Sequence, residues 1–183
     1  MKKKIAILLP FKDHFTKSQA GSASIWVKDF NKYSSYYDQI TILGNTPFVN
    51  ELIDKKKYRN LSLKSTTFSS KNILYVREFI KINLLQKFDL VEIHNRPSYV
   101  HQIAKTGTKI KIVLIFHNNP TTLGGSKSLI ERKFLLNKCD KLIFVSNWVK
   151  ERFFEGFEKK NQHKCIVIYP SVNPLKKFPR KKN

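Results

Sequence analysis

Short apolar runs alternate with amphipathic stretches along most of the chain. The apolar runs are rich in Ile, Val and Leu, which is typical of strands buried on both faces of a parallel sheet. Between these runs, apolar residues recur every three or four positions, which predicts helices. The expected strands cover residues 4–10, 39–43, 89–93, 110–116, 141–145 and 164–169. The expected helices begin at Ser22 and after Ser146, and cover 72–87, 98–105 and 127–137 between these two.

The helical stripes predict which side chains face the sheet. We expect core packing from the following apolar residues: Trp26, Phe30, Tyr33 and Tyr37 in the first helix; Ile73, Val76, Phe79, Ile80 and Leu84, with Leu85 beside them, in the second; and Trp148, Val149, Phe153 and Phe157 in the last. Ser22 or Ser24 is expected to cap the first helix, and Ser146 the last. The region 46–70 is less regular, with a short helix expected around 48–57 and a strand near 60–63.

Strands separated by helices of this length predict an α/β fold. Parallel neighbours need a crossover connection, and the crossovers here are helical, so we expect a doubly wound, Rossmann-like parallel sheet. With 183 residues, of which 41% are hydrophobic, the chain can bury one core. We therefore expect a single domain over residues 1–174, followed by a basic tail or the start of a linker at 175–183.

Two of the expected strands end in a similar polar sequence. One runs into His117-Asn118-Asn119 before Pro120, and the other into His94-Asn95-Arg96 before Pro97. Open α/β sheets bind ligands in the crevice beyond the carboxyl ends of their strands. We therefore expect the two polar tips to converge on one cleft.

A second candidate site follows the first strand. A loop containing Gly21 leads into the helix that starts at Ser22, which places backbone N–H groups and a helix dipole where a phosphate could sit. The chain has no GxGxxG motif at this point, so a simple turn is the alternative interpretation of Gly21.

The charge of the chain is strongly positive. Its 35 basic residues against 13 acidic ones give a net charge of +22, and only six of the basic residues are Arg. Lysine is a hydrated point charge, so this excess favours a diffuse field over a set of phosphate clamps. Three interpretations stay open: a solvated basic surface of compositional origin, an anionic membrane surface as partner, or nucleic acid. The last is the least favoured, because no basic helix carries interleaved aromatic residues.

The cysteines and the amino terminus favour a cytoplasmic protein. Cys139 and Cys165 stand outside any CxxC or Cys/His spacing, which is typical of a reducing compartment. The apolar run near the start ends at Pro10 after five residues, too short for a signal peptide, so it is expected to be the first strand. No zinc motif or P-loop is visible, and we expect neither a metal site nor a cofactor.

The order of these elements resembles the amino-terminal domain of family 4 glycosyltransferases. The resemblance rests on Ala20-Gly21-Ser22 after the first strand, the IFHNNP and LIFVS strand ends, and the final VIYPSVNP, and it covers essentially the whole chain. It implies one half of a GT-B architecture and retaining transfer from a nucleotide sugar. By the same resemblance, His117 would face the donor sugar, and Gly21 and Ser22 would lie against the donor diphosphate and the acceptor. The chain departs from the family pattern at Ala20, where a second Gly is usual, and at Pro170-Ser171.

The remaining residues of the two strand tips have alternative roles. His117 could meet a sugar hydroxyl or a carbonyl oxygen, or simply bond a neighbouring backbone group. Asn118 and Asn119 suit hydroxyl recognition and turns equally well. His94, Asn95 and Arg96 could contact an acceptor, with Arg96 on an anionic group and a cap as the alternative for Asn95. Ser146 is expected to have only a minor functional role beyond its cap.

The resemblance also implies a missing half. In the family, a carboxy-terminal domain supplies most of the nucleotide-sugar site, including two Glu separated by seven residues, and the nearest pair here, Glu151 and Glu158, has the wrong spacing. We expect the acceptor-side half of an enzyme that builds a cell-surface glycan or modifies a lipid-linked acceptor, inactive without that domain in cis or in trans. Such an enzyme would be cytoplasmic, with peripheral attachment to the inner membrane face left open. The alternatives are a non-catalytic sugar- or nucleotide-binding module and, less favoured, a nucleic-acid-binding protein.

Overall fold

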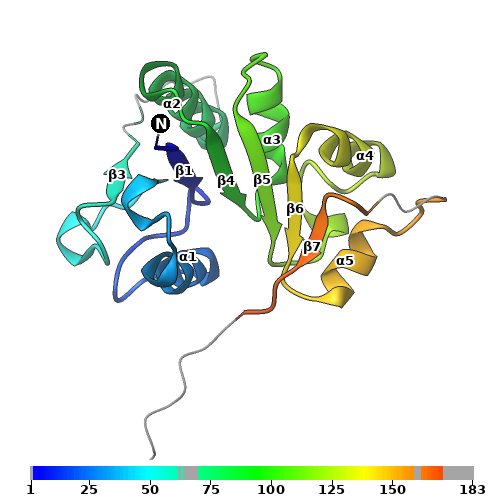
Figure 1. Cartoon of the computed structure of the whole chain (residues 1–183), viewed down its shortest axis with the longest axis horizontal. Helices are drawn as coiled ribbons and strands as arrows, with labels where there is room; N and C mark the ends of the chain where they lie inside the picture. The colour runs from blue at the N-terminus through cyan, green and yellow to red at the C-terminus, as the bar shows by residue number, and fades with distance from the viewer. Residues whose placement is uncertain (1, 62, 64–69, 159–161, 171–183) are drawn as a thin grey trace, which may run out of the picture.

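The structure is a computed structural model that describes residues 2–61, 63, 70–158 and 162–170 (Figure 1). Its elements in chain order are β1 (Ile5–Leu8), α1 (Ser22–Tyr33), η1 (Tyr37–Gln39), β2 (Ile40–Gly44), η2 (Val49–Glu51), β3 (Tyr58–Asn60), α2 (Lys71–Gln86), β4 (Leu90–His94), α3 (Pro97–Ala104), β5 (Lys111–Phe116), η3 (Pro120–Thr122), α4 (Leu129–Lys138), β6 (Lys141–Phe144), α5 (Asn147–Phe153) and β7 (Cys165–Val167). The predicted end of the domain at 171–174 and the predicted tail at 175–183 lie outside the described residues.

The strands form a seven-stranded sheet in the order β3-β2-β1-β4-β5-β6-β7, and each neighbouring pair is parallel. The chain adds strands outward from β1 to β3 on one side, then returns to pair β4 with the other side of β1 and continues to β7. This arrangement confirms the predicted doubly wound sheet. The reversal between β1 and β4 is the topological switch point, where open α/β sheets form their ligand crevice.

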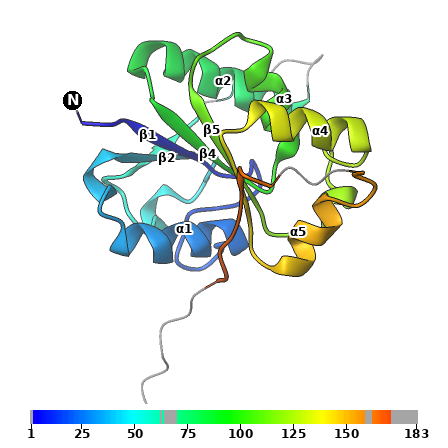
Figure 2. The same cartoon turned by 45° about the vertical axis from the view of Figure 1, so that its right-hand side comes forward.

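Alternate residues of each strand point to opposite faces of the sheet, and the two faces have separate cores. In β1, Ala6 and Leu8 belong to the larger cluster, which also takes side chains from α2, α3, α4 and α5. Ile7 belongs to the smaller cluster, to which α1 is the one contributing α-helix among the described residues. Figure 2 shows α2, α3 and α4 along one side of the strands and α1 on the other.

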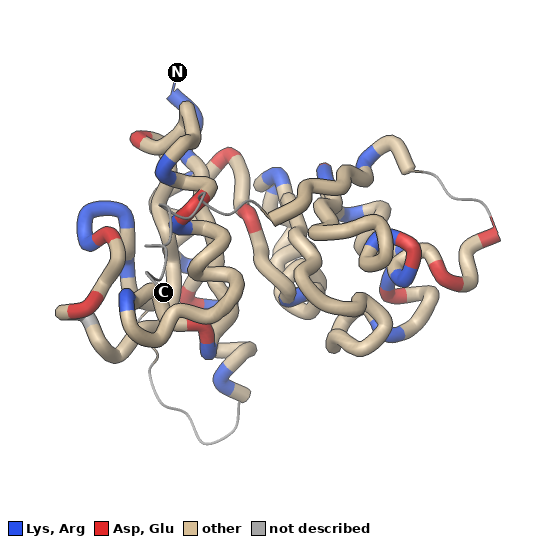
Figure 3. Tube along the Cα trace, turned by 90° about the horizontal axis from the view of Figure 1, so that it is seen from below, with Lys and Arg blue, Asp and Glu red and all other residues tan. Residues whose placement is uncertain are grey.

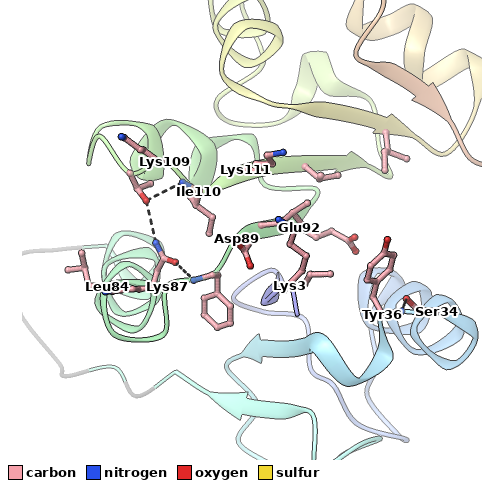
Figure 4. A pocket seen from close by; sticks show the side chains of 17 residues that line it. Lys3, Ser34, Tyr36, Leu84, Lys87, Asp89, Glu92, Lys109, Ile110 and Lys111 are labelled. Carbon is pink, nitrogen blue, oxygen red and sulfur yellow. Dashed lines mark hydrogen bonds between the residues drawn. The ribbon is translucent and has the colours of Figure 1, made fainter. Parts of the chain in front are cut away.

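Among the described α-helices, α1 is the one that packs on this face of the sheet, and part of the face stays open as a groove. The groove encloses about 880 Å³, and its apolar floor includes Leu90, Val113 and Ile143 of three neighbouring strands. Figure 4 shows Lys3, Asp89 and Lys111 at its rim, near the amino ends of β1, β4 and β5. The groove therefore runs along the sheet from the amino ends of these strands.

Three of the predicted helical stripes are partly wrong. In α1 the buried apolar residues are Ala23, Trp26 and Val27, whereas Phe30 and Tyr33 are exposed. The inward face of α1 therefore lies around Ala23, Trp26 and Val27, closer to the start of the helix than the predicted stripe. Tyr37, which was expected to extend the stripe, lies in η1 instead.

The other two stripes deviate at particular positions. At the end of α2, Ile82 and Asn83 are buried, and the Asn83 side-chain oxygen accepts from Phe88 N at 3.2 Å. Leu84 and Leu85 are turned outward, and Ile73, at the start of the same stripe, is also exposed. In α5, Val149 and Phe153 are buried one turn apart while Trp148 is exposed. Apolar character alone did not distinguish these neighbours.

The first helix is capped by a side chain from outside it. The Asp13 carboxylate accepts from Gly21 N at 3.1 Å and from Ala23 N at 3.2 Å, and the Ser24 hydroxyl also donates to it. Ser22 and Ser24 are therefore not the cap that local sequence predicted. In the irregular region, the expected helix around 48–57 shortens to η2, and the expected strand near 60–63 is β3, slightly earlier in the chain.

Basic residues are spread over the described chain. Figure 3 shows Lys and Arg spread along the trace at both ends of the molecule. This distribution singles out no one basic element as a reader of nucleic acid. Among the described residues, no helix has both the length and the apolar character that crossing a membrane requires.

Candidate functional site

The ends of β4 and β5 lie side by side at the carboxyl edge of the sheet. His94 is the last residue of β4, and His117 follows the last residue of β5. Asn95 N donates to Ile115 O at 2.7 Å, which continues the strand pairing to this edge. Figure 1 shows α1 toward the same edge of the sheet as these strand ends.

The two histidines that the sequence singled out contact each other. His94 Nδ1 and His117 Nε2 are 3.0 Å apart, and the rings are 5.3 Å between centroids. The prediction that the two strand tips meet is confirmed, and the shared ligand cleft stays a prediction. His94 is fully buried, and its other nitrogen, Nε2, lies 2.7 Å from Glu92 Oε1. The geometry thus links a carboxylate and two imidazoles in one hydrogen-bonded row.

Helix α1 contributes an aromatic wall to this site. Trp26 meets the His117 ring edge to face, with centroids 5.3 Å apart and an interplanar angle of 88°. Trp26 is stacked on Phe30 at 4.2 Å, so the indole is held in place from its outer side. Since α1 begins directly after Gly21, the small-residue turn and His117 belong to the same part of the molecule through one helix.

His117 is a neutral imidazole in this environment. Burial lowers its pKa to about 3, and a positive charge on the adjacent His94 would act in the same direction. A neutral imidazole carries one N–H donor and one acceptor nitrogen, so it can accept from a hydroxyl or donate to an oxygen without bringing a charge. The described part of the chain offers no hydrogen-bond partner to His117 Nδ1, which leaves that nitrogen for a ligand.

Asn95 holds the backbone at this site. Its φ is +52°, in the left-handed region that Asn tolerates better than most residues. Its side-chain oxygen accepts from His117 N at 3.4 Å and from Asn118 N at 3.3 Å. The predicted cap by Asn95 is wrong, because Arg96 is the N-cap residue of α3 and the Asn95 side chain instead bonds the backbone after β5. Contact of Asn95 with an acceptor or a sugar stays a prediction.

The other residues of the tips are placed as follows. Arg96 Nη1 donates to Asn95 O at 2.9 Å, and Asn118 is exposed. Asn119 Oδ1 accepts from Thr121 N at 3.0 Å and so caps η3, which agrees with the turn alternative for this residue. Ser146 Oγ accepts from Val149 N at 3.2 Å, which confirms the predicted cap of α5. Ligand contacts by Arg96, Asn118 and Asn119 stay predictions.

The predicted phosphate site at Gly21 and Ser22 already contains a carboxylate. A Cβ on Gly21 would lie 2.6 Å from Asp13 Oδ2, so glycine is needed here for the close approach of Asp13. Asp13 brings negative charge to the start of α1, where an incoming diphosphate would meet repulsion as well as N–H donors. Contact of Gly21 and Ser22 with a donor or acceptor stays a prediction.

Sequence reasoning missed three contributors to the site: Asp13, Trp26 and Glu92. For Glu92 a signal was available, because it lies two residues before His94 in a strand and so must share a face with it. Glu92 also lines the groove described above, at the end away from the strand starts (Figure 4). Within the described residues, no group of three His, Cys, Asp or Glu side chains is arranged to hold a metal ion.

Solved structures with a similar fold include three proteins of known name. HepE from Anabaena in complex with UDP-glucose is 12% identical with a TM-score of 0.64, over 92% of this chain and 44% of that protein. Sucrose-phosphate synthase from Thermosynechococcus elongatus is 11% identical with a TM-score of 0.64, over 93% and 49%. A glycosyltransferase from Rickettsia africae is 21% identical with a TM-score of 0.62, over 94% and 44%.

These likenesses show the fold, that of one Rossmann-like half of a GT-B enzyme, and the chain spans less than half the length of each of the three proteins. A search of curated proteins finds no match. Sequence evidence for the family is independent of the fold: the model described as Glycosyltransferase Family 4 matches residues 39–175, well over half of the chain. That stretch includes both histidine-bearing strand ends. The chain therefore belongs to glycosyltransferase family 4.

Proposed function

We propose that this chain is the amino-terminal, acceptor-side half of a retaining glycosyltransferase. It would transfer a sugar from a nucleotide-sugar donor to a cell-surface glycan or a lipid-linked acceptor, and it would need no cofactor because the nucleotide sugar is a substrate. The single observation that carries the proposal is the pair of contacting imidazoles at the carboxyl edge of the sheet, in a chain of this family. A related fold is known in complex with UDP-glucose, which makes a nucleotide sugar a reasonable donor.

The chemistry of retaining transfer suits a neutral His117. Cleavage of a glycosidic bond passes through an oxocarbenium-like state, while negative charge builds on the departing diphosphate. A cationic group next to the developing positive charge of the sugar would oppose it, whereas a neutral imidazole can hydrogen-bond a hydroxyl without this penalty. Burial keeps the pKa of His117 at about 3 and so keeps the ring neutral in the range where enzymes work.

A second domain is part of the proposal. The site described here supplies an imidazole, an aromatic wall and backbone groups, but the described residues bring no cluster of basic side chains to His117 for a diphosphate. We propose that a second Rossmann-like domain, in cis or in trans, supplies those groups and closes the cleft. The complete enzyme would act in the cytoplasm, and the positive charge of the chain would favour peripheral contact with the anionic inner face of the membrane.

The test is sugar transfer by the complete protein. The assay uses this chain with the second domain, either in one polypeptide or as two polypeptides mixed together. The protein is incubated with a panel of nucleotide sugars and membrane lipid extract. Mass spectrometry should show release of the nucleoside diphosphate together with a glycosylated product. Tight nucleotide-sugar binding without any turnover by the complete protein would instead support the alternative, a non-catalytic binding module.

A further inference from the structure

Glu92, His94 and His117 form a continuous hydrogen-bonded row behind the candidate site. The two links measure 2.7 Å from Glu92 Oε1 to His94 Nε2 and 3.0 Å from His94 Nδ1 to His117 Nε2. His94 is 0% exposed, so both of its ring nitrogens are removed from water and depend on these two partners. Glu92 is the outer end of the row, with a side chain that is 26% exposed.

The direction of each hydrogen bond follows from the first link. An ionised carboxylate only accepts, so His94 Nε2 carries a hydrogen. When His94 is neutral, its Nδ1 is therefore a lone pair that accepts from His117 Nε2–H, and His117 Nδ1 becomes an acceptor. When His94 is protonated, Nδ1–H donates to His117 Nε2, and His117 Nδ1 becomes a donor. The protonation state of His94 thus decides which role His117 offers to a ligand.

We propose that Glu92 and His94 are positioning residues of a proton relay that acts through His117 on a hydroxyl bound at His117 Nδ1. This inference rests on the proposed function and deepens it. In the relay step the hydroxyl O–H bond breaks and an N–H bond forms at His117 Nδ1. At the same time His117 Nε2–H breaks and His94 Nδ1–H forms. One proton has moved from the substrate to His94, and no electrons are exchanged with any other group.

The relay explains how His117 handles a proton while staying neutral. His117 resists becoming a cation because it is desolvated, and in the relay it never becomes one, since it gains a proton on one nitrogen as it loses one from the other. The resulting positive charge rests on His94, next to the Glu92 carboxylate, where the opposite charge stabilises it. A carboxylate that orients an imidazole and stabilises the imidazolium acts in this way.

Charged groups from several elements line the same cavities as Glu92. Lys3 before β1, Asp89 before β4 and Lys111 of β5 line the same groove, and Asp29 of α1 lines a second cavity with Glu92. Figure 4 shows Glu92 at the floor of this groove, so the outer end of the relay can exchange a proton with water there. On the His117 side, α1 contributes the uncharged Trp26.

The relay makes a distinctive prediction for nuclear magnetic resonance of the chain itself. Long-range ¹⁵N–¹H correlations of His-labelled protein, recorded over a pH series, report the tautomer of each ring. We expect His117 to switch from the Nε2–H to the Nδ1–H tautomer in the same step in which His94 takes up a proton, while His117 stays neutral. In Glu92→Gln the step should move to lower pH, because the amide cannot stabilise the imidazolium. A His117 tautomer that ignores the titration of His94 would overturn the relay.

Kinetics of the complete enzyme separate the relay from the proposed function. In Glu92→Gln we expect kcat to fall about tenfold or more with KM nearly unchanged, and the acidic limb of the pH–rate profile to move to lower pH. Asp29→Asn, which removes a nearby carboxylate outside the row, should keep the wild-type profile. If His117→Ala abolishes transfer while Glu92→Gln has wild-type kcat and pH profile, the relay is wrong and the proposed function stands. If wild-type protein transfers no sugar, the proposed function is wrong. The tautomer titration then still tests whether His94 and His117 are coupled through their hydrogen bond.

Discussion

The low proton affinity of His117 predicts that acid destabilises the fold by a calculable amount. The pKa of this imidazole is about 3 in the folded chain against an ordinary value of 6.5. Because the unfolded chain binds the proton more tightly, stability is full above the unfolded pKa and is lost as pH falls from there toward the folded pKa. Integrating over the interval from pH 7 to pH 5 gives a loss of about 2 kcal/mol from this one group.

The assay is urea unfolding of the chain at several pH values, compared between wild type and His117→Gln. Glutamine places an amide N–H near the position of the imidazole Nε2, so it can keep the hydrogen bond to His94 Nδ1 without titrating. The interval stops at about pH 5, above the range in which most carboxylates take up protons. We expect the free energy of unfolding of wild type to fall by about 2 kcal/mol more than that of the variant.

The comparison also has a clear negative result. If the two proteins lose stability in parallel as the pH is lowered, His117 binds its proton equally well in the folded and unfolded chains. The burial argument for a neutral His117 would then fail, and with it the reason for placing the moving proton on His94.

Three further predictions concern the scaffold. Gly21→Ala should destabilise the chain by about 1–2 kcal/mol in urea unfolding, because the new Cβ displaces the Asp13 cap of α1. Gly124→Ala, with nothing within 4 Å of its Cβ, should change stability by less than about 0.5 kcal/mol. Equal effects of the two substitutions would contradict the cap. Ser128→Ala should cost about 1 kcal/mol in the same assay, since Ser128 and Glu131 form the capping box of α4; an unchanged unfolding midpoint would speak against it. Burial raises the pKa of both thiols, but Cys139 is fully buried and Cys165 only partly. Iodoacetamide should therefore label Cys165 first, as measured by peptide mass spectrometry. Faster labelling of Cys139 would refute its burial.

The sequence was most informative where its signal is local and repeated. Apolar runs marked the strands, and the abrupt change to His-Asn at two strand ends was enough to predict that His94 and His117 meet, because parallel strands end at one edge. The Ser146 cap was predictable for the same reason, since a cap and its partner lie three residues apart. These features depend on neighbours in the chain or on the period of the strand.

The features that sequence reasoning missed depend on contacts between distant segments. Asp13 caps α1 from eight residues before Gly21, so serines inside the helix were the nearer candidates. Tyr33 and Leu84 continue apolar stripes, yet both are exposed, and helix periodicity alone cannot show how far along a helix the core extends. Glu92 lies within an otherwise apolar strand, so the sequence did not single it out. Its role followed only from the contact with His94 on the same face of the strand.

The most direct test of the account is the turnover of the complete enzyme with and without the His117 imidazole. Sugar transfer by wild type and His117→Ala is measured at saturating donor, with urea unfolding of both proteins as a check that the fold is intact. We expect kcat of the variant to fall by about a hundredfold or more, as for other groups that act on a reacting centre, with an unfolding midpoint close to wild type. A folded variant that transfers sugar at near-normal kcat would contradict the central claim that this strand end is the reaction site.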